Sequence, residues 1–318
     1  MRKRHPQHTV ISFGEILWDI FPEQIVLGGA PLNLACRVHS LGEHAVIASR
    51  LGRDQLGNHA FALATSLGVN TSCVQWDERY PTGTVNVNFS PAGEPDFLIV
   101  PEVAYDYIEV SDQLLGLCSK AAVFCFGTLA QRSEKAGKTL AALLEAAAGS
   151  LKFLDINLRK DCFSERTIRW SLEKADILKL NAEEVRTVSS MLFGEELEVD
   201  RFSRKAVEKF SLQCCLVTLG AGGVLAAERA GKLIYLPGYA VEVADTVGAG
   251  DAFSAGFIHA RLEGKDLAHC CELGNLLGAL AAGKKGATAP ISEEEIAGLR
   301  TGGRNRLRHP GLERFAVV

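Results

Sequence analysis

The chain has 318 residues, with 34 basic and 38 acidic side chains and a formal net charge of −4. This balance lacks the excess of positive charge that is typical of nucleic-acid-binding proteins, so no nucleic-acid partner is expected. Hydrophobic residues make up 47% of the chain and charged residues 23%, which indicates a globular rather than a disordered protein. The uncharged stretch 211–227 is interrupted by Gln213, Thr218 and three glycines, so no membrane span is expected.

The amino terminus is basic, as in a secretory signal, but Glu15 and Asp19 follow too soon for an apolar segment of about 7–15 residues. We therefore expect a cytoplasmic protein. The nine cysteines include two adjacent pairs and no Cys-x-x-Cys spacing, which indicates neither a disulfide framework nor a zinc site. We expect them to be buried free thiols.

Short apolar or β-branched runs alternate with longer helical patterns along the chain. This alternation predicts one α/β domain over 1–318, with a largely parallel central sheet covered by helices on both faces. The predicted strands are residues 9–13, 45–49, 122–126, 152–156, 177–180 and 216–218. The predicted helices are residues 31–41, 54–67, 133–148, 201–210, 250–262 and 266–281.

Residues 81–107 depart from this alternation. Polar and apolar side chains alternate over residues 84–89, and a turn with Pro91 and Gly93 leads to apolar residues 97–100. The pattern predicts an antiparallel hairpin with one face toward water or a ligand. We interpret it as a lid, with an ordinary edge hairpin as the alternative.

The strongest chemical signal is the run 245–257, Asp-Thr-Val-Gly-Ala-Gly-Asp followed by mostly apolar residues. Gly248 and Gly250 stand where a helix is predicted to begin, and N–H groups at a helix start can bind an anion. Asp251 falls in the first turn, where a carboxylate can take the proton of a substrate hydroxyl during phosphoryl transfer. An acidic residue that merely complements the helix dipole is the alternative. The apolar residues 252–260 favour a buried helix start.

This run closely resembles the second signature of the ribokinase-like (PfkB) sugar kinases, and further motifs follow in family order from about Gly14 to Ser292. The resemblance implies a ribokinase-like α/β fold with a small antiparallel β lid formed by residues 15–30 and 81–107. It implies in-line transfer of a phosphoryl group from ATP to a sugar hydroxymethyl group, with Mg²⁺ and with Asp251 as base. The anion hole would be formed by Gly248, Ala249 and Gly250.

Residues 14–19, Gly-Glu-Ile-Leu-Trp-Asp, and 27–33, Leu-Gly-Gly-Ala-Pro-Leu-Asn, are similar to the sugar-binding half of the family. By this resemblance Asp19 accepts hydrogen bonds from sugar hydroxyls, and Asn33 offers both a donor and an acceptor. Without the resemblance, the two glycines would indicate a turn and Asn33 a polar residue at a helix start. The expected substrate-binding residues are Asp19, Gly28, Gly29, Asn33 and Arg159.

Two segments supply the nucleotide side by resemblance. Residues 181–184, Asn-Ala-Glu-Glu, are similar to the Asn-x-x-Glu motif of the family, in which the carboxylate of Glu184 organises Mg²⁺ and water around the phosphates. The backbone of residues 218–223 would line the ATP phosphates and ribose, with Asn275 near the adenine. The expected nucleotide-binding residues are Asn181, Glu184, Thr218, Gly220, Gly222, Gly223 and Asn275.

Many members of the family hold a monovalent cation, mostly through backbone carbonyls. The matching positions are Asp245, Val247, Ala281, Lys284 and Gly286. Because Pro290 stands where some relatives have a serine, K⁺ activation is left open.

The motifs at 14–19, 126–130 and 155–159 look most similar to bacterial fructokinases, which make fructose 6-phosphate. Kinases of 2-keto-3-deoxygluconate also carry an Asp-x-Asn-x-Arg run, in which Arg159 would answer a substrate carboxylate or the transferred phosphate. These kinases, or another sugar kinase of the family, are therefore the alternative.

Three further expectations concern the hairpin and the class of protein. Asn86 and Asn88 on the hairpin favour an uncharged polyol over a nucleoside. A catalytically silent sugar sensor on the same fold is disfavoured because Asp251 and its glycines are intact. A homodimer through the lid is compatible with the enzyme, since a hairpin with a free edge can pair across a two-fold axis.

Overall fold

The computed structural model describes residues 8–89, 95–302 and 305–317. The chain divides into two compact units, Met1–Ser150 and Leu151–Val318, which are described in turn. The turn expected at Pro91 and Gly93 lies outside the described residues. The prediction of one domain over 1–318 stays a prediction.

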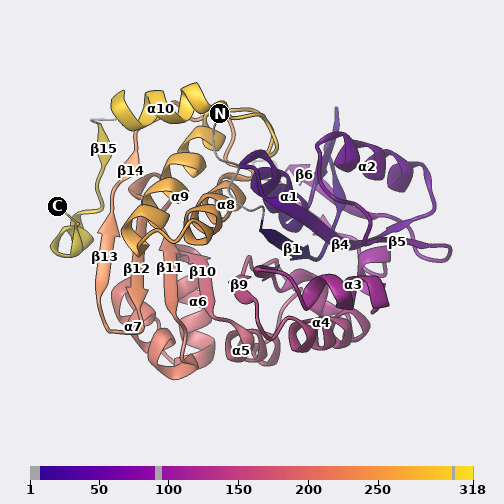
Figure 1. Cartoon of the computed structure of the whole chain (residues 1–318), viewed down its shortest axis with the longest axis horizontal. Coiled ribbons are helices and arrows are strands. Elements are labelled where there is room, and N and C mark those ends of the chain that lie inside the picture. Colours follow the sequence, from indigo (N-terminus) through magenta and orange to yellow (C-terminus); the bar gives the residue numbers. More distant parts are fainter. Residues whose placement is uncertain (1–7, 90–94, 303–304, 318) are drawn as a thin grey trace. The chain divides into compact units, whose positions relative to one another are not determined.

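The first unit contains a parallel sheet in the order β8-β1-β4-β5. Helices α1 and α2 lie on one side of it, and α3 and α4 on the other (Figure 1). The strand β1 is buried over most of its length, as expected for a strand covered on both faces. The strands are β1 (Thr9–Phe13), β4 (His44–Gly52), β5 (Val74–Asp77) and β8 (Val123–Phe126). The helices are α1 (Ala30–Ser40), α2 (Gln55–Ser66), α3 (Asp112–Cys118) and α4 (Glu134–Ala146), with short 3₁₀ turns at Ala104–Tyr107 and Leu129–Arg132.

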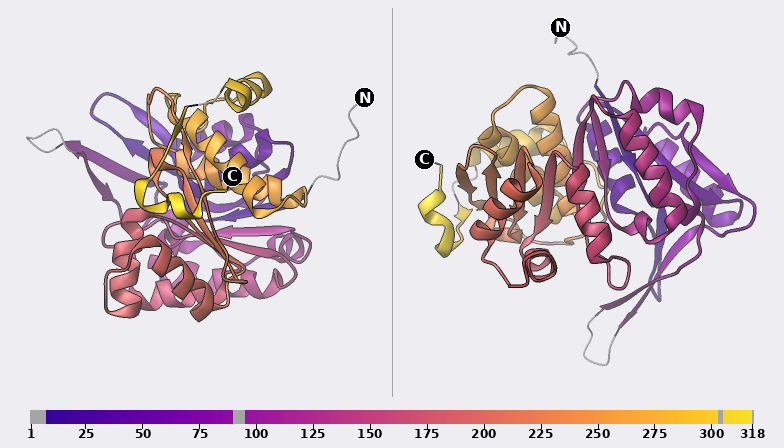
Figure 2. Two further views of the ribbon diagram at one scale, coloured as in Figure 1. Left: turned by 90° about the vertical axis from the view of Figure 1, so that its left-hand side faces the viewer. Right: turned by 90° about the horizontal axis from the view of Figure 1, so that it is seen from below.

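A second, four-stranded sheet of the same unit joins the two segments expected to form the lid. Its order is β3-β2-β6-β7, with antiparallel pairs at β2–β3 and β6–β7 and a parallel pair at β2–β6. In both views of Figure 2, the β6–β7 hairpin extends away from the helices of its unit. The strands are β2 (Leu17–Ile20), β3 (Ile25–Gly28), β6 (Gly83–Phe89) and β7 (Pro95–Ile99).

The second unit contains a sheet in the order β13-β12-β11-β10-β9. The pairs among β9, β10 and β11 are parallel, and β12 and β13 continue the sheet in antiparallel fashion. The strands are β9 (Leu151–Asp155), β10 (Ile177–Asn181), β11 (Cys214–Thr218), β12 (Val224–Glu228) and β13 (Leu233–Leu236). A separate short pair joins β14 (Gly238–Tyr239) to β15 (Arg306–Leu307).

Helices cover both faces of this second sheet. Figure 2 shows α8 and α9 on one face and α5, α6 and α7 on the other. The helices are α5 (Glu165–Lys174), α6 (Ala182–Phe193), α7 (Val199–Phe210), α8 (Ala249–Leu262), α9 (Leu267–Ala282) and α10 (Glu293–Gly302), with 3₁₀ turns at Gly220–Gly222 and Pro310–Phe315.

The predicted α/β class is confirmed, and each predicted strand and helix is present. All nine cysteines are free and buried, as expected. No helix within the described ranges is long and apolar enough to cross a membrane. The sequence patterns did not predict the helices α3, α5, α6 and α10 or the strands β5, β12 and β13, because short or highly polar segments give a weak periodic signal.

Candidate active site

The predicted sugar-binding residues of the first unit lie where β2 and β3 pair and lead into α1. Asp19 pairs with Val26 across the two strands, and Gly28 pairs with Leu17. A Cβ atom at Gly28 would lie 2.6 Å from Oδ2 of Asp19, which is shorter than any normal contact. Because residue 28 is a glycine, the Asp19 carboxylate can lie in the position that a side chain there would otherwise fill.

Gly29 is the N-cap residue of α1, with a φ angle of 109° in the region that favours glycine. A Cβ atom there would lie 2.4 Å from the carbonyl oxygen of Glu15. One turn later, the N–H of Asn33 donates to the carbonyl of Gly29 at 2.9 Å, and the Asn33 side chain is buried. The structure thus brings Asp19, both glycines and Asn33 into one group within the first unit.

In the second unit, the predicted anion hole is the start of α8. Gly248 is the N-cap residue with a φ angle of 77°, and no side chain from the part of the chain that the structure describes caps this helix. Helices α2, α3, α5, α6 and α9 each have a side-chain cap. The first N–H groups of a helix have no partner within it, and they attract negative charge. Asp251 lies half-buried in the first turn.

The loop before α8 packs on the loop after α9, as the predicted cation site requires. The carboxylate of Asp245 accepts the N–H groups of Val247 at 3.0 Å and Gly286 at 3.1 Å. The carbonyl of Ala281 accepts the N–H of Lys284 at 3.0 Å. The Lys284 ammonium lies 2.6 Å from a carboxylate oxygen of Glu295. These residues are brought together, but the Asp245 carboxylate and the Ala281 carbonyl already accept hydrogen bonds in the fold.

Glu184 joins the Asn-x-x-Glu motif to the loop that follows β9. Its Oε1 accepts the N–H of Leu158 at 2.8 Å, and its Oε2 accepts the N–H of Asn181 at 2.7 Å. The Asn181 side chain in turn accepts the N–H of Glu184, which completes a capping box at the start of α6. The Arg159 side chain is exposed on the loop that Glu184 holds through Leu158. Burial and the neighbouring Asp155 carboxylate raise the pKa of Glu184 above its usual value.

The predicted nucleotide-binding segment follows β11 next to this motif. Thr218 pairs directly with Asn181 across β10 and β11. Gly220 has open space around its α-carbon, whereas a Cβ atom at Gly223 would lie 2.1 Å from the carbonyl oxygen of Leu236. The Asn275 amide donates to the same carbonyl at 3.2 Å and to that of Pro237 at 3.3 Å. Asn275 therefore fixes the segment on which the glycine turn, with Gly222 and Gly223, packs.

Lys179, which lies inside β10, was not among the site residues predicted from the sequence. Its Nζ atom is 2.8 Å from Oδ2 of Asp155 and 2.9 Å from the position that a Cβ atom at Gly250 would take. The hydroxyl of Ser254 donates to Oδ2 of Asp155 at 3.2 Å and to the Gly250 carbonyl at 3.1 Å. A lysine in an otherwise apolar strand was the available signal, because such residues are rarely buried without a partner.

A model of the pfkB family of carbohydrate kinases matches residues 22–294 of this chain. The chain belongs to the PfkB family. It is therefore a sugar kinase, as the resemblance of its motifs implied.

Two curated relatives of this PfkB kinase illustrate the family. A putative sugar kinase from Pyrococcus horikoshii is 29% identical over 301 residues, covering 90% of this chain and 94% of the relative. A fructokinase from Escherichia coli is 28% identical over 302 residues, covering 87% and 94%.

Three solved structures with the same fold are each less than 25% identical to this PfkB kinase, so these three support the fold alone. Fructokinase from Xylella fastidiosa with bound ATP has a TM-score of 0.82 at 23% identity, covering 92% of this chain and 98% of that chain. A fructokinase variant from Vibrio cholerae with fructose, ADP and potassium ion has 0.78 at 23%, covering 92% and 98%. The 2-dehydro-3-deoxygluconokinase from Thermotoga maritima has 0.79 at 21%, covering 93% and 100%.

Proposed function

We propose that this sugar kinase transfers the γ-phosphoryl group of ATP to the 6-hydroxyl of D-fructose. The start of α8 supports this reaction class: among the described residues no side chain caps the helix, and Asp251 lies in its first turn. A carboxylate beside N–H groups suits transfer to a hydroxyl, because it can take the proton while the N–H groups hold the phosphoryl oxygens. Asp251 is the base in this proposal, and Gly248, Ala249 and Gly250 form the anion hole.

The second unit also carries the residues that we propose for ATP. The open surroundings of Gly220 and the close packing of Gly223 fit a backbone turn that a nucleotide can approach. Thr218, Gly222 and Asn275 complete this set, with Asn275 acting through the Leu236–Pro237 segment that it holds.

Glu184 and Asn181 fit an outer position around Mg²⁺ rather than direct ligation. Each Glu184 oxygen accepts one backbone N–H, and a carboxylate oxygen has a further lone pair that can accept a hydrogen bond from a metal-bound water. When bound with ATP, Mg²⁺ would neutralise charge on the phosphates. For K⁺, the backbone of Asp245, Val247, Ala281, Lys284 and Gly286 remains the proposed site.

We propose that Asp19, Gly28, Gly29 and Asn33 bind the sugar. Asp19 is only partly buried, which supports this assignment because a sugar hydroxyl needs an accessible acceptor. Arg159 is exposed and would bind a negatively charged group of the substrates. The kinship with the Escherichia coli fructokinase favours fructose, and 2-keto-3-deoxygluconate is the alternative acceptor.

The four-stranded sheet supports the proposal of a lid over the sugar, since it joins segments 15–30 and 81–107 in one element. Phe97 and Leu98 on β7 are exposed, which is compatible with pairing of two copies through this sheet. The cytoplasmic location stays a prediction from the sequence.

A coupled assay of ADP release tests this proposal directly. The purified chain is supplied with ATP, Mg²⁺ and either fructose, 2-keto-3-deoxygluconate, ribose, glucose or adenosine. We expect the highest kcat/KM with fructose. A preference for 2-keto-3-deoxygluconate would replace the substrate and keep the reaction, whereas ADP release independent of every acceptor would contradict the proposed function.

A further inference from the structure

The first turn of α8 rests on a buried ammonium group. The side chain of Lys179 is 9% exposed, and its Nζ lies 2.9 Å from the place where a Cβ atom of Gly250 would be. A positive charge at the amino end of a helix opposes the helix dipole, so it needs compensation from negative charge. Glycine at position 250 allows this charge to approach the backbone that we propose as the anion hole.

Three carboxylates from different elements surround this ammonium. Asp155 at the end of β9 forms the ion pair at 2.8 Å, while Glu184 on α6 and Asp251 on α8 interact with Lys179 electrostatically. On the other side, β11 presents the apolar Leu216 as its register partner. Burial lowers the pKa of Lys179, but the three carboxylates outweigh it and raise the pKa above its usual value. The ammonium therefore stays charged throughout the physiological pH range.

The ammonium group of Lys179 supplies positive charge to the group formed by Asp155, Glu184 and Asp251. Without it, three acidic groups would share a poorly hydrated site, and like charges in such a site raise one another's pKa values. A base must be ionised to accept a proton, so the charge of Lys179 bears directly on Asp251.

We infer that Lys179 is a positioning residue of the phosphoryl-transfer site. Its ammonium group keeps Asp251 ionised and packs against the first turn of α8 at Gly250. The inference rests on the proposed function, because it assigns Lys179 a part in the reaction at Asp251. It goes beyond that proposal because it gives a role to a buried lysine that the proposed function does not use. Lys179 interacts both with the base, Asp251, and with Asp155, the first residue of the Asp-x-Asn-x-Arg run.

The test compares pH profiles of kcat for the wild type, Lys179→Met and Lys179→Arg. Methionine keeps the length of the side chain and removes the charge, so the acidic limb of the profile should move to higher pH by about 1–3 units. The KM for sugar should change by less than about twofold, and Lys179→Arg should keep the limb at the wild-type position. If Lys179→Met fails to fold, Lys179→Gln replaces it, since its amide can still bond to Asp155.

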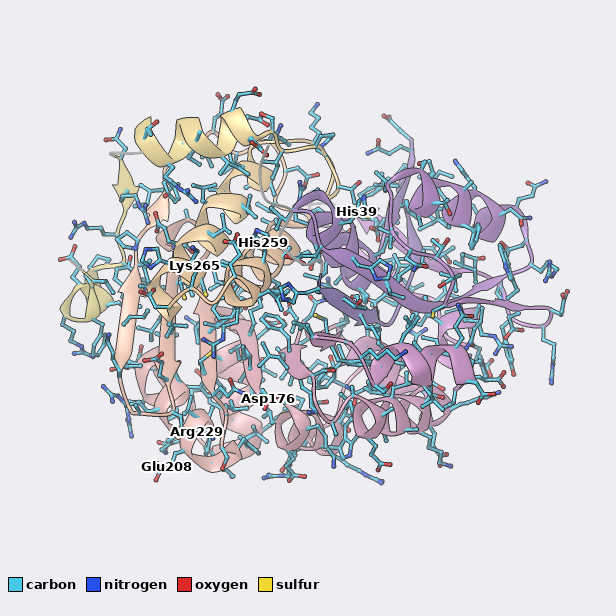
Figure 3. The ribbon with its side chains drawn as sticks, viewed as in Figure 1. His39, Asp176, Glu208, Arg229, His259 and Lys265 are labelled. Atoms are coloured by element: carbon cyan, nitrogen blue, oxygen red, sulfur yellow. The ribbon has the colours of Figure 1, made fainter. Side chains whose placement is uncertain are left out.

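Lys152→Met is the matched control. Lys152 lies on β9, is 18% exposed, and is 4.0 Å from a carboxylate oxygen of Asp176, which Figure 3 labels. It has the same type of partner as Lys179 without the contact at Gly250, so its removal should leave the acidic limb in place.

Thermal unfolding without substrates gives a readout that needs no turnover. Burial already raises the pKa of Glu184 above its usual value, and the charge of Lys179 counteracts this rise, so loss of Lys179 raises the folded pKa of Glu184 further above the unfolded one. Protonation then relieves the penalty, and the Tm deficit of Lys179→Met should shrink as the pH falls from 8 to about 5.5.

An unchanged acidic limb in Lys179→Met, or in the Lys179→Gln variant that replaces it, would overturn the inference. A limb that moves equally in Lys179→Arg would also overturn it. A Tm deficit independent of pH would also contradict it. Absence of turnover in the wild type would instead refute the proposed function, and the pH dependence of Tm would still decide whether the charge of Lys179 stabilises the ionised form of Glu184.

Discussion

The carboxylate of Asp19 packs against the backbone of Gly28, in the position that a side chain at residue 28 would occupy. A methyl group at position 28 would lie 2.6 Å from Oδ2 of Asp19. The carboxylate would have to turn away, and it would then present its oxygens in a different direction. A loss of sugar affinity should follow.

We therefore predict that Gly28→Ala raises the KM for fructose by about tenfold or more, while the KM for ATP changes little. Asp19→Ala should have a larger effect of the same kind, since a hydrogen bond to a charged group contributes about 1.5–3 kcal/mol. Gly116→Ala is the control, because Gly116 lies in α3 with nothing within 4 Å of an added Cβ atom. Equal changes in both KM values would contradict the sugar assignment.

Glu184→Gln should weaken both the fold and the use of Mg²⁺. The glutamine amide has only one acceptor oxygen, so the N–H of either Leu158 or Asn181 loses its partner, at a cost of about 1–3 kcal/mol. Urea unfolding should show this loss, and half-maximal activity should need more Mg²⁺. The adjacent exposed Glu183→Gln should change neither quantity. An unaltered Mg²⁺ titration in a folded Glu184→Gln variant would count against the metal role.

The lid proposal predicts slower amide hydrogen exchange in β6 and β7 when fructose is added. Closure over a bound sugar would exclude water from the site and reduce local opening of the hairpin. Exchange measured by mass spectrometry on peptides from 83–89 and 95–99 tests this. Peptides from α7, in the other unit, serve as the reference. If no substrate changes the rates, the hairpin is scaffold or dimer interface.

The carboxylate of Glu272 on α9 ties β15 to its unit and makes stability depend on pH. Arg306 donates to both Glu272 oxygens, at 2.7 and 2.8 Å, and Tyr239 also donates to Oε1. Burial raises the pKa of Glu272, but the bonds from Arg306 and Tyr239 outweigh it and hold the pKa below its usual value of 4.5. The folded pKa is the lower one, so this stabilisation is present above about pH 4.5 and is lost as the pH falls.

Arg306→Met should accordingly lower the Tm at pH 7, and the difference from the wild type should narrow below about pH 4.5. Differential scanning calorimetry between pH 3.5 and 7 measures this. Arg308→Met is the matched control, because the Arg308–Glu313 pair is exposed and 3.9 Å long. A deficit that stays constant across this range would show that Arg306 contributes by packing alone.

Features that depend on residues close together in the sequence could be predicted, whereas features that depend on contacts between distant residues could not. The alternation of strands and helices, and the glycine-rich start of α8, are local patterns, so they indicated the fold and the reaction class. The β2–β3 pair was expected only through the family resemblance, because its strands are short. Lys179 was missed because its partners Asp155 and Gly250 lie 24 and 71 residues away along the chain, and no local pattern reports a contact at that separation.

The turnover of Asp251→Asn tests whether Asp251 is the base of the reaction. Asparagine keeps the shape of the side chain but cannot take the proton, so kcat should fall by about 10²–10⁴, while calorimetric binding of fructose and ATP and the Tm change little. An aspartate that only complements the helix dipole would instead cost about 0.3–1 kcal/mol of stability and leave turnover nearly normal. A folded Asp251→Asn variant that retains more than about a tenth of the wild-type kcat would show that Asp251 is not the base.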